Sequence, residues 1–143
     1  MHPHPTSSLP RSVRSSVWCW LAAVACGVLE SLVNAVTSPD YDVAVQLSIR
    51  AVVYVLVTLL IVRLRRGEHW VRLALTVLLG VVGLTSLLAE PISWLISGGA
   101  PAAFLATADA PTVAVVALRA IHVVAVVCAL SLMYGRSANK FFR

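Results

Sequence analysis

The sequence predicts an all-helical membrane protein, built as a bundle of four transmembrane helices. Three observations predict this class. First, the chain of 143 residues is 59% hydrophobic and only 12% charged, whereas a soluble domain is about half apolar and about a quarter charged. Second, four apolar runs each approach or exceed the length of about 20 residues that a bilayer-crossing helix needs. Third, the basic residues gather on one side of these runs, as the positive-inside rule describes.

The four spans together make up one transmembrane domain, residues 17–134. In chain order they are predicted at residues 17–36, 43–62, 70–94 and 112–134. The first run is interpreted as a retained span rather than a signal peptide, because it contains Glu30 and no small-residue cleavage site follows it. Residues 1–16 are rich in proline and serine, which predicts a disordered tail. Residues 135–143 are predicted to be a second, basic tail.

Basic residues indicate how the chain is oriented. Nine of them lie in the two tails or beside the connection between the second and third spans: Arg11, Arg14, Arg63, Arg65, Arg66, Arg72, Arg136, Lys140 and Arg143. The other two connections, residues 37–42 and 95–111, contain no Lys or Arg. Both termini are therefore predicted to be cytoplasmic, in a multi-pass protein of a bacterial inner membrane. The net charge of +5 favours anionic lipid headgroups on that side as partners, with no indication of nucleic-acid binding.

Four charged side chains interrupt the apolar spans: Glu30, Arg50, Glu90 and Arg119. A charge near the centre of a membrane helix costs roughly 2.5–3.5 kcal/mol, so it requires a partner, a water-filled cavity or a function. Counted along the helices at about 1.5 Å per residue, Glu30 lies at the same depth as Arg50. Glu90 is likewise level with Arg119. We therefore predict two intramembrane ion pairs, Glu30 with Arg50 and Glu90 with Arg119, which would each staple a helical hairpin or join the two hairpins.

The two hairpins resemble each other in sequence. Residues 43–62 align with residues 112–131 so that Arg50 meets Arg119, and Ile-Arg-Ala-Val in the first matches Leu-Arg-Ala-Ile in the second. An internal duplication of a two-span unit would explain this match, and its copies would have parallel orientation. The alternative is chance, because Leu, Val and Ala align with any apolar segment.

Other polar residues fall near the charges. His122 follows Arg119 by three residues and thus shares its helical face, where it would relay protons or simply be hydrogen-bonded inside the bundle. Asn34, Tyr54 and Ser86 each lie four residues from one of the other charges. The spacing predicts a polar strip on all four helices, facing a common interior and available for a proton or ligand.

Small residues are expected to pack rather than react. Gly80 and Gly83 form a face on the third span that permits close approach of another helix, within the bundle or between protomers. The three cysteines lie inside spans, without C-x-x-C spacing. We find no H-E-x-x-H, phosphate-binding glycine loop or G-x-S-x-G motif. The sequence thus predicts no enzyme, with no catalytic residue, metal site or cofactor.

The C-terminal segment reads Met-Tyr-Gly-Arg-Ser-Ala-Asn-Lys-Phe-Phe-Arg over residues 133–143. Together with the Val-, Ala-, Leu- and Arg-rich composition, it resembles small four-span membrane proteins of actinobacteria. The resemblance implies a four-span fold in a bacterial membrane and carries no activity with it.

The function expected from these features is non-enzymatic. The first hypothesis is an accessory or scaffolding subunit, or a self-associating bundle, held by the Glu–Arg pairs and present as a homo-oligomer or in a larger complex. The alternative is a small transporter or channel-like protein that uses the buried charges around an outward-facing polar cavity. A cavity that reaches the charges would favour transport, whereas tightly packed pairs without access would favour the structural role.

Overall fold

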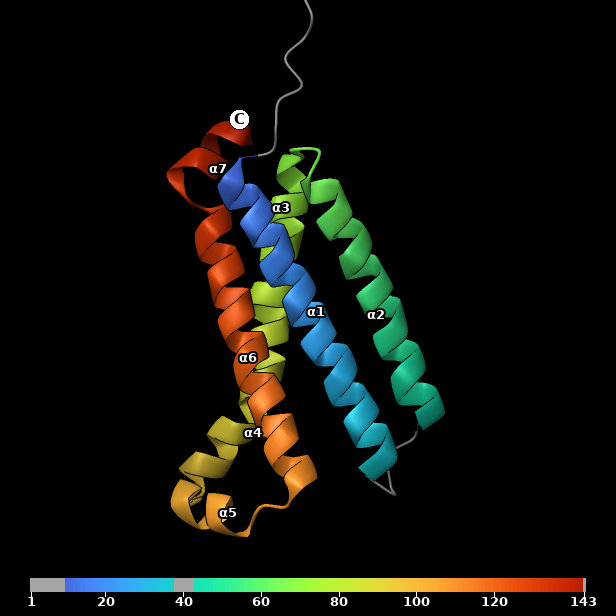
Figure 1. Ribbon diagram of the computed structural model, residues 1–143, viewed down its shortest axis with the longest axis vertical. Helices are drawn as coiled ribbons and strands as arrows, with labels where there is room; N and C mark the ends of the chain where they lie inside the picture. The colour runs from blue at the N-terminus through green and yellow to red at the C-terminus, as the bar shows by residue number, and fades with distance from the viewer. Residues whose placement is uncertain (1–9, 38–42, 143) are drawn as a thin grey trace, which may run out of the picture.

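The computed structural model describes residues 10–37 and 43–142, and every regular element in them is helical (Figure 1). In chain order the elements are α1 (Arg11–Thr37), α2 (Val43–Leu64), α3 (His69–Leu75), η1 (Thr76–Gly83), α4 (Leu84–Ile96), α5 (Pro101–Thr107), α6 (Ala110–Met133) and α7 (Arg136–Phe141). The η1 segment is π-helical and joins α3 to α4. The all-helical class predicted from the sequence is confirmed.

Four stretches of helix are long and apolar enough to cross a membrane: Arg11–Thr37, Leu47–Leu64, His69–Ile96 and Ala110–Met133. The third stretch consists of α3, η1 and α4. Figure 1 shows the start of α1, the α2–α3 turn and α7 together at one end of the bundle, which we call the basic end. The connection from α4 through α5 to α6 lies at the opposite end, which we call the cleft end.

The first helix begins earlier than the sequence predicted. Residues 11–16, assigned to the disordered tail, form the first turns of α1. Val13 and Ser16 are buried there, and the Ser16 hydroxyl donates a hydrogen bond of 2.9 Å to the carbonyl of Ala129 on α6. Burial against α6 makes these polar turns helical, which local composition does not reveal. Residues 1–9 of the predicted tail and residues 38–42 of the first connection lie outside the described residues.

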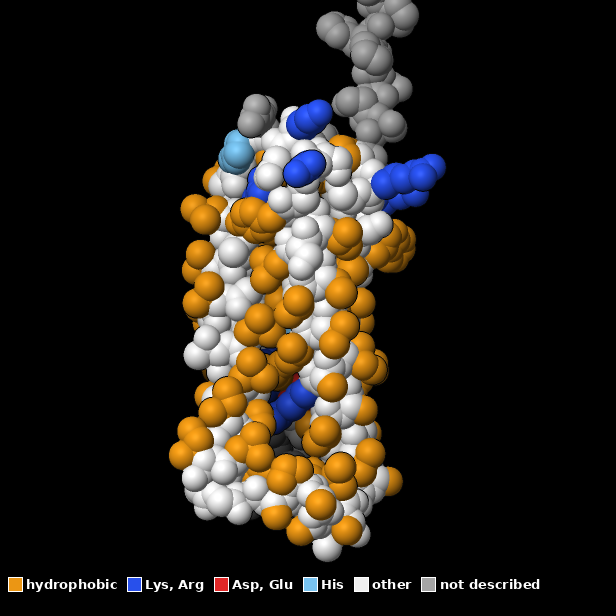
Figure 2. All heavy atoms as spheres, turned by 90° about the vertical axis from the view of Figure 1, so that its left-hand side faces the viewer, with side chains coloured by type: hydrophobic (Ala, Val, Ile, Leu, Met, Phe, Trp, Pro, Cys, Tyr) orange, Lys and Arg blue, Asp and Glu red, His pale blue; other side chains and the backbone are white. Residues whose placement is uncertain are grey.

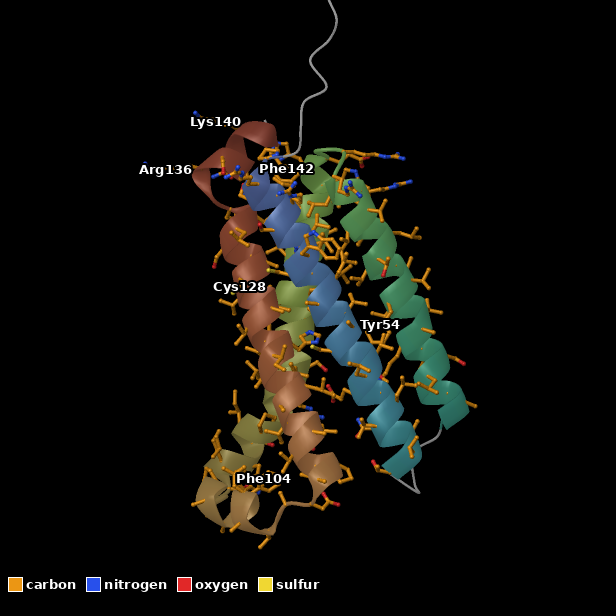
Figure 3. All side chains as sticks on the ribbon, in the orientation of Figure 1. Tyr54, Phe104, Cys128, Arg136, Lys140 and Phe142 are labelled. Carbon is orange, nitrogen blue, oxygen red and sulfur yellow. The ribbon has the colours of Figure 1, made fainter. Side chains whose placement is uncertain are left out.

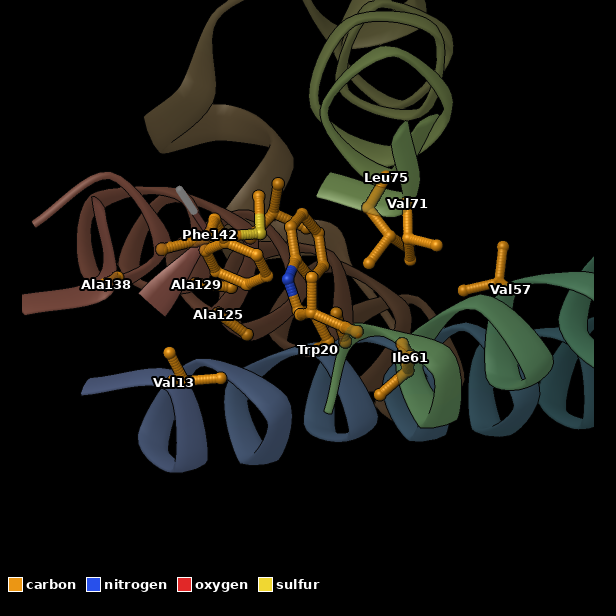
Figure 4. Packing of buried hydrophobic residues seen from close by; sticks show 14 residues of the cluster. Val13, Trp20, Val57, Ile61, Val71, Leu75, Ala125, Ala129, Ala138 and Phe142 are labelled. Carbon is orange, nitrogen blue, oxygen red and sulfur yellow. The ribbon is translucent and has the colours of Figure 1, made fainter. Parts of the chain in front are cut away.

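The main hydrophobic core lies toward the basic end, where α1 packs along α6. Its largest fully buried side chains are Trp20, Phe142, Ile61, Leu64, Leu75 and Met133. Figure 4 shows Trp20 near the middle of the cluster, with Leu75 and Val71 to one side and Phe142 to the other. Five of the eight described helical elements (α1, α2, α3, α6 and α7) and the residue that follows α7 thus contribute side chains to one buried cluster. This half of the bundle is closed.

The C-terminal segment is part of this core rather than a free basic tail. Ala138 and Phe142 are buried against it. The buried guanidinium of Arg72 lies 3.9 Å from the centre of the Tyr134 ring, and its Nη2 donates a hydrogen bond of 2.6 Å to Asn139 Oδ1. A planar guanidinium stacks on aromatic rings in a way that an ammonium does not. The segment predicted as a basic tail at residues 135–143 therefore contains a short helix, α7, and is docked on the core over its described residues up to Phe142.

Packing is much sparser at the cleft end. The α4 helix makes few contacts outside its own span, and α2 packs against α1 and α3. Pro91 lies inside α4 and cannot donate a backbone hydrogen bond there, and its ring crowds the preceding turn. Figure 1 shows the end of α4 turning away from α6, with α5 below the space between them. The helices at this end therefore do not fill the interior with side chains.

Candidate functional site

The charged residues predicted in the spans meet at the cleft end around one arginine. Arg119 on α6 donates from Nε to Glu30 Oε1 on α1 at 2.9 Å, and from Nη1 to Glu90 Oε2 on α4 at 2.9 Å. We call these three residues the charged triad. A guanidinium has five donors in a rigid plane, so it can hold two carboxylates at once. The triad connects three of the four spans.

The pairing of Glu30 with Arg50 predicted from the sequence is wrong. Arg50 Nη1 instead donates a hydrogen bond of 2.9 Å to Ser31 Oγ, and Ser31 donates one of 2.8 Å to the carbonyl of Gly27. Successive residues on an α-helix are rotated by about 100° because a turn contains 3.6 residues. Glu30 consequently faces α6 while its neighbour Ser31 faces α2. Arg50 thus reaches the residue next to Glu30, and the rotation of α1 decides which of the two is its partner.

The three charged side chains differ strongly in accessibility. Glu30 is 6% exposed, Arg119 is 30% exposed and Glu90 is 76% exposed. Glu30 is therefore held inside the bundle by Arg119, whereas Glu90 presents its carboxylate outward. One positive and two negative charges leave the triad with an excess of one negative charge when all three are ionised.

Two members of the triad, Glu90 and Arg119, line two adjoining clefts. The larger, which we call the main cleft, has a volume of about 700 Å³ and lies between α4, α5 and α6, with Glu90 and Arg119 in its lining. The second has a volume of about 400 Å³ and shares these two residues, adding Asn34 and Asp109. Figure 2 shows a hollow in the lower half of the molecule, with a basic side chain recessed among apolar ones.

Aromatic rings line the main cleft. Trp94 on α4 and Phe104 on α5 meet edge to face, with ring centres 5.7 Å apart. Gly99 makes this possible, because a Cβ at that position would overlap the Trp94 ring. Figure 3 places Phe104 at the cleft end, far from Arg136 and Lys140 at the basic end. The predicted connection at residues 95–111 is thus an ordered wall that contains a short helix.

Asp109 starts the helix that carries Arg119. Its Oδ1 accepts a hydrogen bond of 3.1 Å from the backbone N–H of Thr112, in the usual N-cap arrangement. Hydrogen bonding from the Thr112 side chain, together with this bond from its backbone N–H, lowers the pKa of the Asp109 carboxyl below its ordinary value. Asp109 is therefore ionised at neutral pH and adds a further negative charge to the second cleft.

The remaining polar residues do not share one interior. His122 lies near Glu30 and the backbone of Ala23, and its buried Nδ1 has no hydrogen-bond partner in the described part of the chain. Asn34 lines the second cleft. Tyr54 lies on the other side of α1, with its hydroxyl 3.4 Å from that of Ser31, and Ser86 is exposed and lines neither cleft. The predicted strip along all four helices is therefore incorrect.

The two glycines of the third span have different surroundings. A Cβ on Gly80 would lie 3.2 Å from Leu130 Cδ1, so this glycine permits close approach to α6. A Cβ on Gly83 would meet only its own helix, 3.3 Å from the carbonyl oxygen of Leu78. Both belong to η1, whose π-helical winding was not predicted from the sequence. Such segments occur as local bulges inside longer helices, and the hydropathy pattern used to find the span does not distinguish them.

Cys19, Cys26 and Cys128 are all free thiols. Among residues 10–37 and 43–142, no group of three or more His, Cys, Asp or Glu side chains is arranged to hold a metal ion.

The chain is thus an all-helical protein over its described residues, with four stretches long and apolar enough to cross a membrane and a cleft at one end that exposes a carboxylate. No protein-family model, curated protein or solved structure matches the chain.

Proposed function

We propose that this membrane protein binds a small solute in the main cleft and acts as a small transporter or channel-like protein. The observation that carries the proposal is the access to Glu90, which is 76% exposed at a cleft of about 700 Å³. Ligand pockets in proteins commonly measure roughly 300–1,000 Å³ and combine an apolar lining with a few polar groups. A charge kept accessible within a membrane span is also a recognised sign of a functional site.

The closed half of the bundle is consistent with an outward-open state. Trp20, Ile61 and Met133 are fully buried between the charged triad and the basic end. A solute that entered the cleft would therefore stop at the triad until helices moved. The third span is the one suited to such movement, because α4 has few contacts with other spans and is preceded by the π-helical η1.

The orientation of the protein in the membrane follows from where its basic residues lie. Arg63, Arg65 and Arg66 lie at or beside the α2–α3 turn at the basic end, and Arg136 and Lys140 lie on α7. The positive-inside rule assigns this end to the cytoplasm. Under our proposal the cleft opens to the outside of a bacterial inner membrane, and the two hairpins derive from one duplicated unit.

Thiol labelling tests whether water reaches the cleft. The three native cysteines are replaced by alanine, and Val116→Cys is introduced into the lining of the main cleft. Ile49→Cys on α2 is the matched control, because it is exposed and lies as far from the start of its helix as Val116 does. A charged, membrane-impermeant methanethiosulfonate applied outside should label position 116 much faster. Equal, slow labelling at both positions would contradict a solute-binding cleft.

The accessory or self-associating role is the second candidate, and two observations favour it: α4 has few contacts outside its own span, and α2 exposes large apolar side chains such as Ile49 and Val52. A helix with few contacts inside its own chain is available to another chain, where close packing supplies most of the association energy. The expected result for this candidate is a stable dimer or larger oligomer in detergent, measured by light scattering after size exclusion. A monomer that still labels at position 116 would favour the binding role.

A further inference from the structure

We infer that the main cleft takes a hydrophobic organic cation, an amine or quaternary ammonium or phosphonium group carried on an apolar body. This inference deepens the proposed function and rests on it. Four features of the described residues carry it: the charge balance at the cleft end, the position of Glu90, the aromatic wall and the size of the cleft.

The charge balance at the cleft end is negative. Three carboxylates belong to the triad or to the lining of the two clefts: Glu30, Glu90 and Asp109. Arg119 is the only basic residue that lines either cleft within the described ranges, and its Nε and Nη1 are already engaged by two of these carboxylates. An anion approaching Arg119 would meet the exposed carboxylate of Glu90 beside it. A cation would instead reduce the excess of negative charge.

Glu90 is placed to make that contact. One of its oxygens, Oε2, accepts the hydrogen bond from Arg119, while the side chain as a whole is 76% exposed. An ionised carboxylate has about four acceptor positions, so the arginine leaves most of them available. Glu30 differs, because its side chain is only 6% exposed and lies behind the guanidinium. Glu90 is therefore the residue that would touch the ligand, and Glu30 positions Arg119.

The walls select an apolar ligand body. Trp94 and Phe104 face the cleft beside Leu95, Leu105 and Val116. Aromatic faces attract cations and bury apolar surface at the same time, which suits an organic cation. A small inorganic cation would need more oxygen ligands than this lining offers. The volume of about 700 Å³ accommodates a body of several rings.

Direct binding of two probes of equal shape and opposite charge tests the inference. Tetraphenylphosphonium and tetraphenylborate are each dialysed to equilibrium against the purified full-length protein in detergent. We expect saturable binding of the phosphonium alone. Glu90→Gln should weaken it roughly tenfold or more, because the attraction between the phosphonium charge and the Glu90 carboxylate is lost. Glu68→Gln is the matched control, because the Glu68 carboxylate lies at the basic end, where it accepts a hydrogen bond from Trp70 Nε1. Phosphonium binding should not change in this variant.

A second variant keeps the test valid if Glu90→Gln fails to fold. The outcomes also separate the inference of a cationic ligand from the proposed solute cleft. Trp94→Leu keeps every charge and should also weaken phosphonium binding. Equal binding of both probes, or unchanged phosphonium binding in Glu90→Gln, would overturn the cation inference while leaving a solute cleft intact. Failure of both probes to bind, with fast labelling at position 116, would overturn it in the same way. Slow labelling at position 116 would instead overturn the proposed function itself.

Discussion

Replacing Arg119 by glutamine should destabilise the protein more than any other single change in the charged triad. The substitution removes the guanidinium that contacts Glu30 at 2.9 Å and Glu90 at 2.9 Å. Glu30 is only 6% exposed, so it would be left as a buried charge without a counter-charge. Breaking a buried pair in this way costs about 3–5 kcal/mol. Glu90 is 76% exposed and its loss from the pair should cost about 0–1 kcal/mol.

The remaining members of the series follow from the same geometry. Glu30→Gln leaves Arg119 paired with Glu90, so it should cost less than Arg119→Gln. The double change Glu30→Gln with Arg119→Gln removes the uncompensated charge and should be more stable than Arg119→Gln alone. Arg50→Gln loses one hydrogen bond from a charged guanidinium to Ser31, worth about 1.5–3 kcal/mol, and should be additive with Glu30→Gln.

Reversible unfolding in mixed micelles, with increasing sodium dodecyl sulfate and followed by circular dichroism, measures these differences. The double-mutant cycle for Glu30 with Arg119 should show a clear coupling energy, and the cycle for Glu30 with Arg50 should show almost none. The pairing of Glu30 with Arg119 would be refuted if Arg50 coupled to Glu30 more strongly than Arg119 does. It would also be refuted if Arg119→Gln cost no more than Glu90→Gln.

Three further predictions follow from other contacts. Gly27→Ala would place a Cβ 2.7 Å from the Tyr54 hydroxyl oxygen and should cost about 1–3 kcal/mol in micelle unfolding. Tyr54→Phe should relieve most of that cost. An unchanged cost in the double variant would show that this contact is unimportant. Arg72→Lys should loosen the C-terminal segment, because lysine cannot stack on Tyr134 as a guanidinium does. Carboxypeptidase should then release Phe142 faster. An unchanged rate of release would contradict the docking of this segment on the core. The pKa of Asp109 is lowered in the folded protein by the bond from Thr112, so its stabilising effect is present at neutral pH and lost as pH falls below about 4. Asp109→Asn should lack this acid-dependent part in unfolding measured from pH 6 to pH 3, and identical pH profiles would argue against it.

The number and order of the spans were determined by the sequence alone. Whether a stretch of about 20 residues prefers the bilayer depends on its summed apolar character, which requires no knowledge of its neighbours. The depth of each charge along its helix is equally local, since it depends on the rise per residue. The match in depth between Glu90 and Arg119, which lie in contact, was available at this level.

Tertiary structure decided which groups meet. Glu30 pairs with Arg119 rather than Arg50 because the rotation of α1 and its packing along α6 choose among residues of equal depth. The burial of Phe142 and the cleft beside Glu90 depend on contacts between residues far apart in the chain. Helix rotation, crossing and the gaps they leave are properties of packed surfaces, and hydropathy along one segment contains no information about them. The spans were therefore predictable, while the site required the assembled bundle.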